Sequence, residues 1–214
     1  MTASDSADER ARSTDLVRWA LWLLGFTIAY NIGEGIIAVW FGSAAGSTSL
    51  VAFGLDSGIE CGAAVVLMWR VVVEVRGADG ERAEAAERRA MRFVGGTFMA
   101  LAIYVAAEAA TTLWNREPPE ASVIGIVLTM VSLLIMPALA WVKLRNARRI
   151  SSRALESEAK ETIACAWLSA ITLGGLAANA AVGWWWADPV AGLAMIPWLI
   201  REGMEGLRGK ADCC

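Results

Sequence analysis

The chain has 214 residues, of which 57% are hydrophobic, and its 19 Lys and Arg against 22 Asp and Glu residues give a formal net charge of −3. This composition is too apolar for an ordinary soluble domain. It therefore excludes a water-soluble globular protein and predicts an all-α integral membrane protein with no nucleic-acid partner.

Six apolar segments approach the roughly 20 residues that a membrane-spanning helix needs. In chain order they are Leu16–Phe41, Leu50–Val75, Phe93–Trp114, Ser122–Trp141, Thr162–Val182 and Pro189–Ile200, the last continuing through Leu207. The sequence thus predicts a six-transmembrane-helix bundle. The stretches between them are a tight hairpin at 42–49, a hydrophilic loop at 76–89, a Pro-broken turn at 115–121 and a basic linker at 143–153.

Two helix boundaries are predicted more closely. We expect the fifth helix to begin near Arg153 and to end at Asn179, a residue that can occupy the position after a helix end. Asp188 is expected to be the N-cap of the sixth helix, with Pro189 at its first position. The Trp-rich stretch between these two helices then lies at the outer membrane interface.

Lys and Arg residues divide unequally between the two sides of the predicted bundle. With the N-terminus inside, 18 of the 19 basic residues are cytoplasmic and only Arg116 is outside. This distribution predicts that both termini are cytoplasmic. Three regions follow: a polar N-terminal tail at 1–14, a six-span domain at 15–208, and a short cytoplasmic tail at 209–214 that contains Cys213 and Cys214.

The second apolar segment contains two acids in the sequence GLDSGIECG at 54–62. Asp56 and Glu60 are four residues apart and share one helix face, while Gly54, Gly58 and Gly62 form a stripe suited to close helix packing. An ionisable side chain at mid-bilayer costs about 2.5–3.5 kcal/mol on insertion scales. The pair is therefore either a functional site or a protonated tie between helices.

Other segments supply polar groups at helical spacing. Glu161 and Cys165 are one turn apart on the fifth segment, so with Asp56 and Glu60 they can close a four-ligand site of oxygen and sulfur atoms. Such a donor set suits zinc or a similar divalent ion. Further candidates are Asn31 and Glu34 on the first segment, Glu108 on the third, and Cys61, which is otherwise a small buried hydrophobe.

These motifs resemble the transmembrane domain of the cation diffusion facilitators. That family has D-x-x-x-D in its second span and H-x-x-x-D in its fifth; here the corresponding sequences are GSTSLVAFGLDSGIE and SEAKETIACAWLSA. GWWWADPVAGLAMIPWLIREG is similar to the family's last loop and sixth span, and the resemblance covers roughly residues 15–208. It looks closest to a short branch that includes a vertebrate synaptic-vesicle zinc transporter, because both carry N-x-x-E-G and D-S-x-x-E.

The resemblance implies a proton-coupled exporter of divalent metal ions that works by alternating access, and no enzyme. It places the metal at Asp56, Glu60, Glu161 and Cys165, with Asn31, Glu34, Glu108 and Cys61 as auxiliary metal or proton sites. Zn²⁺ is the favoured cargo, with Cd²⁺, Co²⁺, Fe²⁺ and Mn²⁺ as alternatives, and no prosthetic group is expected. The partners are metal ions, protons and the lipid of a bacterial inner (cytoplasmic) membrane, and a homodimer is expected.

The sequence departs from the family in three ways. We expect the cytoplasmic metal-binding domain and the His-rich loop to be missing, and the site contains no His because the chain has none. Cys213 and Cys214 could capture a soft ion or belong to an inert tail. Two other functions stay open: a small-cation or drug–proton antiporter that uses Glu34, and a non-transporting membrane scaffold or sensor.

Overall fold

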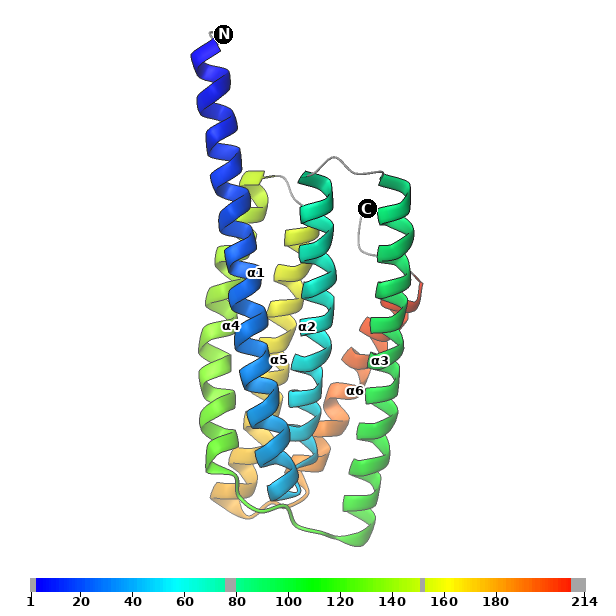
Figure 1. Cartoon of the computed structure of the whole chain (residues 1–214). Coiled ribbons are helices and arrows are strands. Elements are labelled where there is room, and N and C mark those ends of the chain that lie inside the picture. The colour runs from blue at the N-terminus through cyan, green and yellow to red at the C-terminus, as the bar shows by residue number, and fades with distance from the viewer. Residues whose placement is uncertain (1–2, 76–79, 151–152, 209–214) are drawn as a thin grey trace.

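Six α-helices make up the part of the chain that this computed structural model describes, which is residues 3–75, 80–150 and 153–208 (Figure 1). They are α1 (Ala3–Ala45), α2 (Thr48–Val75), α3 (Gly80–Asn115), α4 (Val123–Ile150), α5 (Arg153–Val182) and α6 (Ala187–Leu207). No strand occurs within those residues. The prediction of an all-α bundle is confirmed.

The helices form a four-helix group with a helix pair at its side. α1 packs against α2 and α4, and α5 packs against α4 and α2. α3 and α6 pack mainly against each other and also contact α2, while α6 contacts α5 as well. One end of the bundle holds the start of α1, the end of α2, the start of α3, the end of α4 and the start of α5 (Figure 1). That α6 runs back toward this end agrees with termini on one side; that this side is cytoplasmic stays a prediction.

Five helices in the described part of the chain are long and apolar enough to cross a membrane. The stretches are Leu21–Ala45, Thr48–Val66, Met91–Asn115, Val123–Arg148 and Glu158–Val182. α6 has 21 residues, which at about 1.5 Å per residue matches a hydrocarbon core of about 30 Å. It is not among the five because Asp188 at its start and Arg201, Glu202 and Glu205 near its end interrupt its apolar sequence. Its crossing of the membrane stays a prediction.

Large apolar side chains cover the outside of the bundle. The exposed fraction is 89% for Trp114, 74% for Trp22 and 72% for Trp40. Water-soluble monomers rarely expose so much contiguous apolar surface. Lipid is the environment that such a surface fits, and Trp side chains near helix ends are typical of the membrane interface.

Two predicted connections are wrong because the helices continue through them. α3 begins at Gly80, so most of the expected loop at 76–89 is helical, and α4 continues to Ile150 through most of the expected linker at 143–153. The first stretch is rich in Ala, Glu and Arg, and the second is rich in Arg; these residues are strong helix formers. The apolar pattern ends where the membrane would end, but the backbone hydrogen bonds of both helices continue beyond that point.

The predicted end of α5 is three residues too early. The helix continues through Val182, and Gly183 follows it with a φ of 71°. Gly adopts this left-handed conformation without the steric penalty of other residues, which is why it commonly follows a helix end. Asn179 instead donates its side-chain amide to the Pro119 carbonyl at 2.8 Å, which ties α5 to the α3–α4 connection.

The predicted cap of α6 is also wrong. Trp186 is the N-cap residue and makes no side-chain cap bond. The fully buried Asp188 accepts hydrogen bonds from Ser47 Oγ at 2.7 Å, from Ser49 Oγ at 2.5 Å and from Ser49 N at 3.4 Å. These donors lie at the first turn of α2. Asp188 therefore completes the N-terminus of α2 rather than that of its own helix.

Close packing of glycines occurs at one position of the predicted α2 stripe. A methyl group on Gly54 would lie 2.8 Å from Ala38 Cβ of α1, whereas methyl groups on Gly58 and Gly62 would meet no heavy atom within 4 Å. The prediction of a continuous packing stripe is therefore wrong. Another close glycine contact joins α3 and α6, where a methyl group on Gly206 would lie 2.7 Å from Gly95 Cα.

Candidate functional site

A small cavity lies where α2, α5 and α6 meet, with α3 contributing one side chain. The space open to the centre of a water-sized sphere is about 10 Å³, which is room for about one water molecule or one bare ion. The lining residues are Asp56, Glu60, Ala63, Phe98, Glu161, Ala164, Trp198 and Glu202. Three of the four predicted metal ligands thus share one cavity, and a fourth acid that the sequence analysis did not single out joins them.

Asp56, the first acid of the cavity, is buried without hydrogen-bond partners in the described part of the chain. Its exposed fraction is 2%, and neither of its carboxyl oxygens has a hydrogen-bond partner in the described part of the chain. A buried charged carboxylate without partners is expensive, so such groups bind a cation or take up a proton. Asp56 therefore has the surroundings of a carboxyl group that binds a cation or carries a proton.

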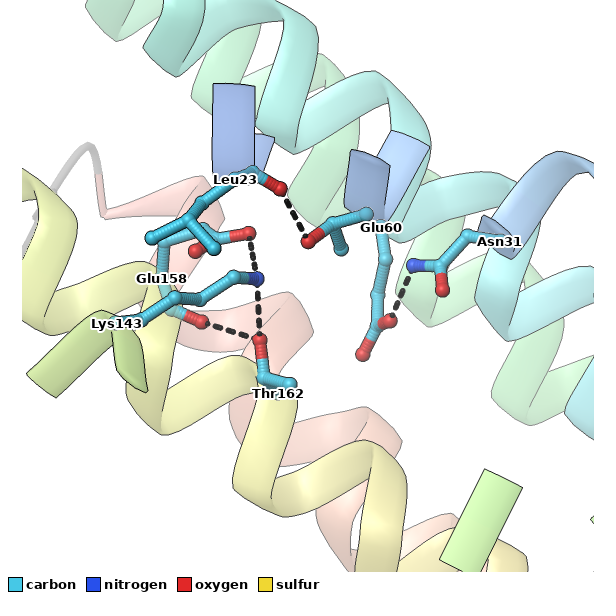
Figure 2. Close-up of polar contacts among 7 residues, drawn as sticks. Leu23, Asn31, Glu60, Lys143, Glu158 and Thr162 are labelled. Carbon is cyan, nitrogen blue, oxygen red and sulfur yellow. Dashed lines mark hydrogen bonds and ion pairs between the residues drawn. The ribbon is translucent and has the colours of Figure 1, made fainter. Parts of the chain in front are cut away.

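Glu60 is half-buried and is held from α1. Asn31 donates its side-chain amide to Glu60 Oε2 at 3.1 Å, as Figure 2 shows. The Asn31 side chain is itself 2% exposed. Because an amide donor fixes the carboxylate without neutralising it, Asn31 orients Glu60 and leaves its charge available for a cation.

Cys165 lies one turn from Glu161 but does not line the cavity. Its exposed fraction is 0%, and it packs within the apolar core. Across residues 3–75, 80–150 and 153–208, no group of three or more His, Cys, Asp or Glu side chains stands ready to hold a metal ion. The acids therefore face one space without converging on one point in this conformation.

The auxiliary candidates do not line this cavity. Glu34 is 2% exposed and accepts a hydrogen bond from Ser57 Oγ at 3.0 Å, which joins α1 to α2. Cys61 donates to the Ile28 carbonyl at 3.6 Å, and Glu108 is exposed on α3. Neither these three side chains nor Asn31 appears in the cavity lining. Cys213 and Cys214 lie outside the described residues.

Sequence reasoning missed a buried ion pair between α4 and α5. Lys143 Nζ lies 2.6 Å from Glu158 Oε1 and donates to Thr162 Oγ1 at 2.9 Å (Figure 2). The side chains of Lys143 and Glu158 are 0% and 6% exposed. The signal was present, because a lysine directly after the apolar sequence ALAWV is rarely free of an acidic partner. It was overlooked because 143–153 was interpreted as a solvated linker.

Glu202 was also missed, although helical spacing could have found it. Trp198 and Glu202 are four residues apart and therefore lie on one face of α6. Both line the cavity. Glu202 was overlooked because Arg201, the residue before it, was counted among the cytoplasmic basic residues, which placed Glu202 beyond the membrane.

Comparison with known proteins agrees with this arrangement. The sequence pattern of the cation efflux transmembrane domain matches residues 24–208. The chain belongs to the cation efflux family. The matched region contains every residue that lines the cavity.

A relative of this cation efflux protein is named only as an uncharacterized transporter, from Synechocystis sp. It is 24% identical over 176 residues, which cover 78% of this chain and 57% of the relative. The chain thus spans just over half the length of the curated relative that it matches. Residues 24–208 therefore form a transmembrane domain of the cation efflux family.

Proposed function

We propose that the protein exports a divalent metal ion, Zn²⁺ or a similar ion, in exchange for protons, by alternating access. The observation that carries this proposal is Asp56, whose two buried carboxyl oxygens have no partner in the described chain and which shares a cavity with Glu60 and Glu161. Acids at this spacing on two helices supply the oxygen ligands of a divalent cation. Cys165, one turn from Glu161, is the fourth proposed ligand.

The size of the cavity favours an ion over an organic cation. A drug-sized ligand needs a pocket of about 300–1,000 Å³, whereas this cavity offers about 10 Å³. Glu34, the acid on which a drug–proton antiporter would depend, lies outside it and is bonded to Ser57. A non-transporting scaffold does not require a buried acid without hydrogen-bond partners.

Proton coupling follows from the chemistry of the ligands. A carboxylate or thiolate must be deprotonated to bind metal, so metal ions and protons compete for the same atoms. When the site opens to the side from which protons enter, protonation of Asp56, Glu60 and Glu161 releases the ion. The same protonation makes the empty site tolerable within the membrane, because neutral acids cost less to bury than charged ones.

The remaining proposals concern assembly and location. We propose a homodimer in a bacterial inner membrane, with Glu34, Glu108 and Cys61 as auxiliary groups. Mass analysis of the protein in native-like lipid tests the dimer, and a monomer there would refute it.

Transport itself is tested in vesicles that contain the purified protein and an imposed pH gradient. Zn²⁺ uptake should follow the gradient, should reverse when the gradient is reversed, and should be inhibited by other divalent ions. Uptake that is unaffected by the gradient would rule out proton coupling. If no divalent ion moves or binds, the protein is not a metal transporter.

A further inference from the structure

The acid contributed by α6 has no role in the set of ligands considered so far. We propose that Glu202 is a further carboxylate ligand of the cargo ion, so that oxygen atoms from three helices, α2, α5 and α6, surround the cation. This inference rests on the proposed function, because it assumes that the cavity holds a divalent cation. It also narrows the cargo to ions that accept several oxygen ligands.

The first support is position. Glu202 lines the same cavity as Asp56, Glu60 and Glu161. Like charges within one small space repel each other unless a cation lies between them.

The second support is that α6 is held in place at this point. Gly203, the next residue, packs on Met99 of α3, where an added methyl group would lie 2.8 Å from the Met99 side chain. Gly206 packs on Gly95 still more closely. Successive helix residues point about 100° apart, so the contact of Gly203 with α3 leaves Glu202 on the face that lines the cavity. A change in the packing of α6 would therefore move one ligand without moving the others.

The third support comes from Asp56 and is independent of Glu202. A buried acid whose two oxygens lack partners in the described chain indicates a missing ligand in this cavity. Four carboxyl groups provide more oxygen atoms than a tetrahedral zinc site requires. Ions that take six oxygen ligands, such as Mn²⁺, use them better. Glu202 should therefore matter more for Mn²⁺ than for Zn²⁺.

The experiment measures Mn²⁺ and Zn²⁺ binding by calorimetry to the full chain in lipid nanodiscs. Glu202→Gln removes the charge and keeps the volume. Its matched control is Glu205→Gln on the same helix, because Glu205 pairs with Arg201 at 3.0 Å and does not line the cavity. We expect Glu202→Gln to weaken Mn²⁺ binding by at least about tenfold, since even the loss of an outer-shell partner costs this much. Zn²⁺ binding should weaken less, and the control should bind both ions as the wild type does.

Two further variants, Glu202→Asp and Asp56→Asn, separate the role of Glu202 from the proposed function. Glu202→Asp retains a carboxylate and should recover part of the Mn²⁺ affinity, and it replaces Glu202→Gln if that variant does not fold. Wild-type affinity in both Glu202 variants, together with lost binding in Asp56→Asn, would overturn the role of Glu202 and leave the proposed function standing. Wild-type affinity in Asp56→Asn as well would overturn both. Equal losses in Glu202→Gln and Glu205→Gln would indicate an effect of α6 as a whole and would also overturn this role.

Discussion

Glu158 and Glu161 lie within one turn of α5 and meet opposite surroundings. Glu158 is paired with the buried Lys143 at 2.6 Å, whereas Glu161 faces a cavity with three other acids. A charge inside a membrane protein needs a counter-charge. The protein supplies that counter-charge for Glu158 at the α4–α5 contact, whereas under the proposed function a bound cation supplies it at the cavity. Internal pairing thus distinguishes the structural ion pair from the proposed cation site.

The largest expected effect is at the unpaired site. Asp56→Asn should lower the affinity for Zn²⁺ by more than about a hundredfold, beyond the range for loss of an outer-shell partner, because it removes a charged ligand. The free energy of unfolding should not fall, since Asp56 has no hydrogen bond to lose in the described chain. Calorimetry and denaturant unfolding measure the two quantities.

The control for this variant is Glu120→Gln, which also replaces an acid by its amide, at an exposed position in the α3–α4 connection. It should bind Zn²⁺ as the wild type does. If Asp56→Asn also retained wild-type affinity, Asp56 and Glu60 would be a protonated tie between helices. The contrast with Glu158 would then have no functional meaning.

Substitutions at the Lys143–Glu158 ion pair should lower the stability of the protein rather than its affinity for metal ions. Lys143→Met should lower the free energy of unfolding by about 3–5 kcal/mol, because it leaves Glu158 buried without its counter-charge. The double variant Lys143→Met/Glu158→Leu should recover most of that loss. Denaturant unfolding in detergent micelles measures both variants.

Lys160→Met is the control on the same helix region, because Lys160 pairs with Glu156 at 3.5 Å on an exposed surface. Its effect should stay within about 0.5 kcal/mol. If the double variant were no more stable than Lys143→Met, the cost would not come from an unpaired charge. Lys143 would then stabilise the α4–α5 contact through packing alone.

Substitution of Asn31 tests how Glu60 is held in its orientation at the cavity. Asn31→Ala should weaken Zn²⁺ binding by about tenfold, because Glu60 loses the donor that holds it, and outer-shell partners of metal ligands contribute this much. Asn115→Ala is the control, since Asn115 bonds only weakly to Glu117 at 3.4 Å on the surface. Unchanged affinity in Asn31→Ala, measured by calorimetry, would show that Glu60 needs no support from α1.

The helices and three of the cavity's acids could be predicted from the sequence. Apolar length and helical spacing are local, so they locate α1 to α5 and place Asp56 with Glu60 on one face. Lys143 and Asp188 could not be interpreted this way, because each finds its partner on another helix. Helical spacing places Glu202 on one face of α6 with Trp198, but its place in the cavity also depends on how α6 packs against α3. Such contacts are set by the tertiary structure and leave little trace in local sequence.

Substitution of Cys165 has the smallest expected effect, and it tests whether the cation depends on carboxylates alone. It was predicted as a ligand because it is one turn from Glu161, yet it is fully buried in the apolar core and does not line the cavity. A thiolate favours soft ions. If Cys165 joins the site when α5 moves, Cys165→Ser should therefore weaken Cd²⁺ binding by about tenfold, which is the scale of a lost metal ligand or its support. Zn²⁺ binding should weaken less. Competition between the two ions, followed by calorimetry, measures the ratio directly. An unchanged ratio would assign Cys165 to the core, and the cation would then depend on carboxylates alone.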